Sequence, residues 1–214
     1  MHGMKRPNIQ EQMPNPMTLE QVGMILALDM SLRERAAAHL LAGHGWRQNE
    51  LLEVLAGEVR AISGGQLWCH GKQRAEWAPV LPETAELLSL LADGLADDEQ
   101  VFRGKRGRNE KFGYEGMRKL VRDLMRRAGL TGFTGHNLRD TFATLVTEES
   151  GDLTLAMQLI RDKVPGVASR YVKRDLPALL ERYSPVRQLE RKPSPLVGES
   201  GVLERESLVE TGES

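Results

Sequence analysis

One interval of this sequence breaks an otherwise helical pattern, and it restricts what the chain can fold into. Apolar residues recur at helical spacing through most of residues 18–183. Within residues 59–80 the pattern changes to short segments separated by Gly64-Gly65 and Gly71-Lys72, which are typical of tight turns. We therefore predict an α+β fold that is mostly helical and contains one small three-stranded antiparallel sheet. The expected strands are 59–62, 66–70 and 75–80.

Two capping boxes mark the start of the helical part. Thr18 is followed three residues later by Gln21, and Ser31 is followed three residues later by Glu34. In such pairs each side chain accepts a hydrogen bond from the other residue's backbone N–H, so a helix begins at each pair. The further predicted helices are 46–55, 82–91, 113–128, 136–149, 153–161 and 177–183.

The composition excludes several classes of protein. The 214 residues are 40% hydrophobic and 28% charged, with no apolar run near the roughly 18–20 residues of a membrane helix. The N-terminus has no apolar stretch of the kind found in signal peptides. Cys69 is the single cysteine and the five histidines form no ligand motif, so we expect no disulfide, metal or other cofactor. These features predict a cytoplasmic protein with no membrane partner.

The charge is unevenly distributed along the chain. Although the net charge is −1, residues 103–127 contain ten Lys or Arg and three Asp or Glu. That stretch fits either a surface for a polyanion or a solvated helix face. Residues 196–214 contain five Glu and one Arg, which is typical of a disordered acidic tail. We expect a flexible arm at 1–16, one folded domain at 17–190 and a disordered tail at 191–214.

Four short motifs occur in a fixed order. They are GWRQNELLEV around Arg47, GKQRAEWAPV with Lys72, HNLRDTFATL with His136 and Arg139, and RDKVPGVASRY ending at Tyr171. Tyr171 follows Arg139 by 32 residues. Each motif alone is common, but their order and spacing resemble the catalytic domain of the tyrosine recombinases, the phage-integrase family.

This resemblance covers about residues 17–188 and implies a function. It implies site-specific cleavage and rejoining of DNA through a 3′-phosphotyrosine intermediate, without metal or ATP. It also implies the family's mostly helical catalytic fold, double-stranded DNA as a partner and self-association on paired DNA sites. In the family a C-terminal segment packs onto a neighbouring subunit, a role that would fall near residues 176–188.

The chemistry of the matching side chains agrees with this implication. Cleaving a phosphodiester without a metal requires cations for the phosphate oxygens and groups that accept and donate protons. Arg47 and Arg139 are the expected phosphate ligands, because a guanidinium binds phosphate bidentately. Glu50, one turn from Arg47, either holds that guanidinium or forms a surface ion pair. Histidine is the side chain that most readily exchanges a proton near neutral pH, so His136 is expected to accept the tyrosine proton or bind the phosphate. The resemblance implies that Lys72 protonates the leaving 5′-oxygen.

The order of the tyrosines selects the nucleophile. Tyr114 precedes the His-x-x-Arg motif, and Tyr183 lies 44 residues after Arg139, beyond the family's spacing. Tyr171 is therefore the residue expected to attack phosphorus.

The sequence departs from the family at its second histidine. The family has a His or Trp eight or nine residues before the tyrosine, in a Leu-Gly-His context, and here the chain reads Ile160-Arg161-Asp162-Lys163. Counting from Arg139 places Asp162 at the position of this histidine, whereas counting from the matching Gln158 places Lys163 there. We favour Lys163 because an ammonium can donate to a phosphate oxygen, whereas a charged Asp162 would repel it. Arg161 is a further possible donor, or forms a structural ion pair with Asp162.

Two smaller departures concern neighbouring residues. Asp140 follows Arg139 where the family often has His, and Trp77 stands where it often has Arg. The family also has a helical DNA-clamping domain before the catalytic one, whereas few residues precede Thr18 here. The chain is then a fragment, a minimal recombinase or a relative that has lost strand exchange.

Three alternative functions remain open. The first is a catalytically degenerate DNA-binding relative that occupies recombination sites or regulates a full-length recombinase. The second is a helical interaction domain that matches the motifs by chance. The third is a relaxing enzyme of the type IB topoisomerase kind, which shares the chemistry but lacks sequence preference.

Overall fold

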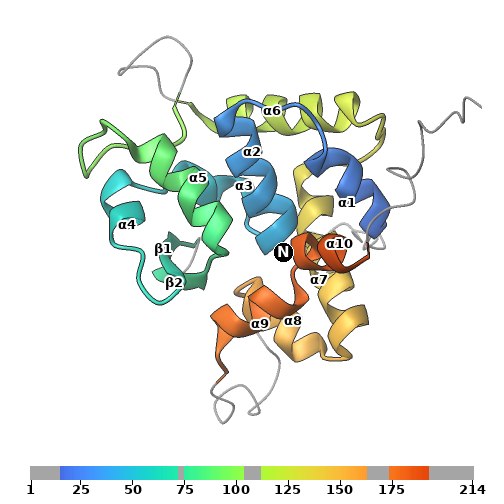
Figure 1. Ribbon diagram of the computed structural model, residues 1–214. Helices are drawn as coiled ribbons and strands as arrows, with labels where there is room; N and C mark the ends of the chain where they lie inside the picture. Colours follow the sequence, from blue (N-terminus) through green and yellow to red (C-terminus); the bar gives the residue numbers. More distant parts are fainter. Residues whose placement is uncertain (1–14, 72–74, 104–111, 163–173, 193–214) are drawn as a thin grey trace, which may run out of the picture.

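The computed structural model describes residues 15–71, 75–103, 112–162 and 174–192 (Figure 1). Helices make up most of this part of the chain, and a β-hairpin interrupts them between α4 and α5. The described helices are α1 (Leu19–Leu26), α2 (Leu32–Ala38), the π-helical turn η1 (His39–Gly43), α3 (Gln48–Leu52), α4 (Ala56–Arg60), α5 (Pro82–Ala92), α6 (Tyr114–Arg127), α7 (Gly135–Ser150), α8 (Leu153–Leu159), α9 (Leu176–Tyr183) and α10 (Pro185–Arg191).

Both predicted capping boxes are formed. The Thr18 side chain accepts from the Gln21 N–H and the Ser31 side chain from the Glu34 N–H, and each partner side chain accepts in return. Half of the same arrangement is present at the start of α3, where the Arg47 N–H donates to Glu50 Oε2 at 2.8 Å. The starts of α1, α2 and α3 are therefore fixed by the local sequence.

The sheet has two strands among the described residues, not the predicted three. β1 (Gln66–His70) pairs antiparallel with β2 (Ala75–Pro79), with Trp68 opposite Trp77. The segment 59–62 instead completes α4 and the turn after it. The Leu55 N–H donates to Glu58 Oε2 at 2.9 Å, which stabilises a helical start before this segment. A short apolar segment fits either a strand or a helix, and here the cap at Leu55 favours the helix.

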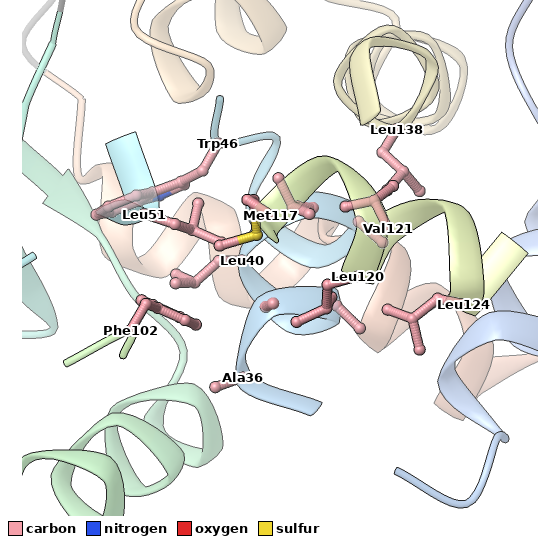
Figure 2. Packing of buried hydrophobic residues seen from close by; sticks show 14 of the residues in the cluster. Ala36, Leu40, Trp46, Leu51, Phe102, Met117, Leu120, Val121, Leu124 and Leu138 are labelled. Atoms are coloured by element: carbon pink, nitrogen blue, oxygen red, sulfur yellow. The ribbon is translucent and has the colours of Figure 1, made fainter. Parts of the chain in front are cut away.

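The buried hydrophobic residues form two clusters. The larger one packs α2, α3 and α6 around Trp46, Leu40, Leu51 and Met117, as Figure 2 shows. The smaller one contains Phe142 of α7 together with apolar residues of α8, α9 and α10. Because Trp46 is fully buried in the larger cluster, the next residue, Arg47, is anchored at the edge of that core.

The C-terminal helices pack onto their own chain. Leu180 and Val186 are buried in the smaller cluster, and α10 contacts α1. Ser184 Oγ donates to the Gly43 carbonyl at 2.7 Å, which ties α10 to η1. The resemblance implies a contact with a neighbouring subunit near residues 176–188. Within the single chain Leu180 and Val186 of this segment are buried, whereas Ala178, Glu181 and Arg182 are exposed. None of the helices in the described ranges is long and apolar enough to span a bilayer.

Candidate active site

A cleft of about 890 Å³ brings together residues from distant parts of the sequence. Arg47 and Glu50 reach it from the start of α3, and His136 and Arg139 reach it from the first turns of α7. The end of β1 contributes His70 and Gly71. Further lining comes from α6, which presents Tyr114, Arg118, Val121 and Arg122. Three of the six predicted site residues, Arg47, His136 and Arg139, therefore line one cleft together with part of the basic stretch at 103–127.

The other three predicted site residues, Lys72, Lys163 and Tyr171, lie outside the described residues.

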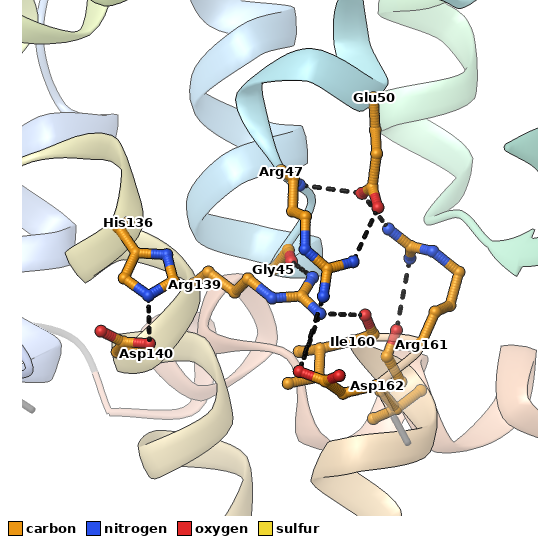
Figure 3. A network of polar contacts seen from close by, with 10 residues as sticks. Gly45, Arg47, Glu50, His136, Arg139, Asp140, Ile160, Arg161 and Asp162 are labelled. Carbon is orange, nitrogen blue, oxygen red and sulfur yellow. Dashed lines mark hydrogen bonds and ion pairs between the residues drawn. The ribbon is translucent and has the colours of Figure 1, made fainter. Parts of the chain in front are cut away.

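Arg139 is held by two backbone carbonyls. Its side chain is only 4% exposed. Nη1 donates to the Gly45 carbonyl at 2.7 Å, and Nη2 donates to the Ile160 carbonyl at 2.6 Å (Figure 3). Gly45 has a φ of +65°, and a Cβ there would lie 2.7 Å from side-chain atoms of Ile160 and Phe142. The glycine before Trp46 therefore lets the chain bring a carbonyl to Arg139.

The protonated form of Arg139 is less stable than that of an arginine in water. Burial and the nearby guanidinium of Arg47 lower the pKa of Arg139 to about 10, although Glu50 and Asp162 oppose the shift. Arg139 remains protonated at neutral pH. Two guanidiniums that line the same cleft attract an anion to the space in front of them.

Glu50 connects Arg47 to Arg161. Its Oε1 accepts from Arg47 Nη1 at 3.0 Å, so the expected contact between Glu50 and Arg47 is confirmed. Its Oε2 accepts from Arg161 Nη2 at 2.5 Å, and the side chains of Glu50 and Arg161 are only 3% and 4% exposed. The Arg161 guanidinium also lies over the Trp46 ring, 4.8 Å from its centroid. The sequence did not reveal this second contact.

Asp162 faces both arginines of the cleft. Its Oδ2 lies 3.5 Å from Arg47 Nη2 and 3.6 Å from Arg139 Nη2, as Figure 3 shows. Arg161, which we considered as its ion-pair partner, is directed to Glu50 instead. The Arg161 backbone has a φ of +57°, which is unusual for a residue other than glycine.

His136 lies at the open side of the cleft. Its side chain is 78% exposed, and its Nε2 is 3.7 Å from Asp140 Oδ1. The helix start that carries it is capped by the Asn137 side chain, which accepts from the Thr134 N–H at 2.8 Å. An exposed imidazole beside a carboxylate is able to reach a ligand that enters the cleft.

Known proteins are similar to this chain in sequence and in fold. The profile of the phage integrase family matches residues 16–175. Tyrosine recombinase XerC from Actinobacillus pleuropneumoniae is 26% identical over 193 residues, which cover 85% of this chain and 61% of that relative.

Two solved structures show the likeness in three dimensions. The integrase from mycobacterium phage Brujita has a TM-score of 0.63 at 24% identity, covering 86% of this chain and 61% of that one. The XerH site-specific recombinase in a post-cleavage complex with its palindromic difH substrate has a TM-score of 0.57 at 19% identity, covering 87% of this chain and 55% of that one.

The match has a defined extent. The chain spans about three fifths of the length of the curated XerC relative. The family profile itself extends over well more than half of the chain and includes Arg47, His136 and Arg139. This chain therefore belongs to the phage integrase family.

Proposed function

We propose that this chain is the catalytic part of a site-specific tyrosine recombinase that cleaves and rejoins double-stranded DNA. The observation that carries the proposal is the convergence of Arg47 and Arg139 on one cleft, each guanidinium oriented by other groups of the chain. Two fixed guanidiniums suit the non-bridging oxygens of a phosphodiester, where negative charge grows in the transition state.

The proposed reaction needs one nucleophile, one base and one acid. The Tyr171 oxygen attacks phosphorus, the phenolic proton passes to His136, and the bond between phosphorus and the 5′-oxygen breaks. Lys72 donates the proton that the leaving 5′-oxygen takes up. The 3′-phosphotyrosine bond conserves the energy of the broken phosphodiester bond. A DNA 5′-hydroxyl can therefore attack it and reverse the reaction without ATP.

The DNA partner follows from the charge of the cleft and from the relatives. Arg118 and Arg122 of α6 line the cleft beside Arg47 and Arg139, which supports contact with a polyanion. The XerH structure contains that protein's DNA substrate. We propose that this chain also acts on duplex DNA and assembles with further copies on paired sites.

The backbone supports Asp162 as the residue at the family's second-histidine position. Glycine precedes that histidine in the family, and glycine adopts positive φ most readily. Here Arg161 has a φ of +57°, so Ile160-Arg161-Asp162 parallels Leu-Gly-His. Lys163, which we favoured for its charge, is the next residue and remains the alternative.

A covalent-trapping assay tests the function. The wild type, Tyr171→Phe and Tyr183→Phe are incubated with a pool of nicked DNA duplexes and separated on a denaturing gel. We expect a protein–DNA adduct in the wild type and in Tyr183→Phe, and none in Tyr171→Phe. An adduct that is lost only in Tyr183→Phe would show that the nucleophile is misassigned.

A catalytically degenerate DNA-binding protein is the second candidate function. The observation that favours it is the Asp162 carboxylate in front of Arg47 and Arg139, where it repels phosphate. Salt-sensitive binding of the same duplexes without any adduct would support this second function. The absence of both binding and adduct would contradict both.

A further inference from the structure

The carboxylate of Asp162 lies against both arginines of the cleft. A single oxygen, Oδ2, lies 3.5 Å from Arg47 Nη2 and 3.6 Å from Arg139 Nη2. In Figure 3 this oxygen lies beside both guanidiniums, on the side opposite Glu50. An anion shared by two guanidiniums is the arrangement expected for a phosphate oxygen.

The end of α8 places Asp162 there. The Asp162 N–H donates to the Met157 carbonyl at 2.9 Å, and the Arg161 N–H donates to the Gln158 carbonyl at 3.0 Å. With Arg161 in the left-handed conformation, these bonds form a Schellman motif, the common way to end a helix. The carboxylate is therefore brought to the arginines by its own backbone.

The two arginines keep their orientation through other groups. Arg139 donates to the carbonyls of Gly45 and Ile160 at 2.7 and 2.6 Å. Arg47 donates to Glu50 at 3.0 Å. The distances to Asp162 are longer than those of charge-assisted hydrogen bonds, about 2.7–2.9 Å. Asp162 is thus not needed to position either guanidinium.

We propose that Asp162 is an internal counter-anion that competes with the scissile phosphate for Arg47 and Arg139. This rests on the proposed function for the identity of the phosphate, but the competition itself concerns any phosphate group. The Asp162 side chain is 47% exposed, so it has room to rotate into solvent when a phosphate binds. Its distances of 3.5 and 3.6 Å to the two guanidiniums exceed those of charge-assisted hydrogen bonds, so these contacts are weak enough to be exchanged in this way.

The first test is phosphate binding without DNA. Inorganic phosphate is titrated into the wild type, Asp162→Asn and Asp162→Ala, and the side-chain Nε–Hε signals of Arg47 and Arg139 are followed by NMR. We expect both variants to bind phosphate about tenfold more tightly, because two competing ion pairs are removed. Asp93→Asn is the matched control, since it makes the same charge change at an exposed residue after α5, outside the cleft.

The outcomes separate competition from positioning. Tighter binding in both Asp162 variants, with Asp93→Asn close to the wild type, supports the proposal. Unchanged or weaker binding in the Asp162 variants overturns it, and weaker binding would mean that Asp162 orients the arginines. The absence of any phosphate-dependent shift at Arg47 and Arg139 in both variants also overturns it.

The second test uses the nicked duplexes of the trapping assay. We expect Asp162→Asn to form the adduct about tenfold faster than the wild type and than Asp93→Asn, since the phosphate no longer displaces a carboxylate. If no protein forms an adduct, the proposed function fails, while the phosphate titration still decides the role of Asp162. If adducts form at equal rates in all three proteins, recombinase chemistry stands and the competition is contradicted.

Discussion

At the scale of single residues, Glu50 holds two arginines at once. One oxygen accepts from Arg47 at 3.0 Å and the other accepts from Arg161 at 2.5 Å. Arg161 and Glu50 are both buried, so each compensates a charge that would otherwise be costly. A buried pair behind Arg47 thereby fixes the guanidinium that lines the cleft.

Neutralising Glu50 should therefore destabilise the whole chain. We expect Glu50→Gln to lower the free energy of unfolding by about 3 kcal/mol, because Arg161 keeps a buried charge without its partner. Urea denaturation followed by circular dichroism measures this change. Glu53→Gln is the control, since Glu53 is exposed in the same cleft and should change stability by about 0.5 kcal/mol or less. Equal effects of the two substitutions would contradict a structural role for the Glu50 pair.

The sequence revealed half of this network. The contact between Arg47 and Glu50 joins the N-cap of α3 to the residue three positions later, so local spacing predicts it. The contact between Glu50 and Arg161 joins residues separated by 111 positions and depends on a positive φ at Arg161. Neither the long-range pairing nor a left-handed arginine is encoded in a local pattern.

At the scale of the elements, short-range rules predicted most helices and the hairpin. Capping boxes located α1 and α2, and Gly64-Gly65 located the turn before β1. The prediction of a strand at 59–62 is wrong. Its few apolar residues fit both the two-residue period of a strand and the 3.6-residue period of a helix, and the cap before α4 favours the helix. We did not predict α10, a seven-residue helix that directly follows α9.

Ser184 joins these last two helices and attaches them to η1. Its Oγ accepts from the Val186 N–H at 3.3 Å as the N-cap of α10 and donates to the Gly43 carbonyl at 2.7 Å. We expect Ser184→Ala to lower the free energy of unfolding by about 2 kcal/mol, through the lost cap and the unpaired buried carbonyl. Chemical denaturation measures the loss.

A second serine provides the control for this prediction. Ser89 is exposed on α5, so Ser89→Ala should change stability by about 0.5 kcal/mol or less. If Ser184→Ala costs no more than Ser89→Ala, then the docking of α10 does not depend on this hydroxyl.

At the scale of the whole molecule, a buried histidine links stability to pH. His44 Nδ1 donates to the His39 carbonyl at 2.9 Å, and its Nε2 accepts from the Leu81 N–H at 3.0 Å. Burial lowers the pKa of His44 from 6.5 to about 3. The unfolded chain therefore binds one more proton than the folded chain between these two values, so stability falls as the pH falls from about 6.5 towards 3.

This linkage predicts a measurable slope. Between pH 6 and pH 4 the wild type should lose about 1.4 kcal/mol of unfolding free energy per pH unit more than a His44→Gln variant. Urea denaturation at several pH values gives both slopes, and the common contribution of the carboxylates cancels in their difference. Parallel slopes would show that His44 is protonated in the folded chain.

The two carbonyls that hold Arg139 come from two segments that are far apart in the sequence. Gly45 precedes Trp46 of the larger cluster, and Ile160 belongs to the smaller cluster. A partial opening that moves the Gly45 segment away from the end of α8 breaks at least one of these two bonds. The proposed DNA cleavage would then require the fully closed molecule, and heating should abolish phosphate binding at Arg139 while much of the helical signal persists.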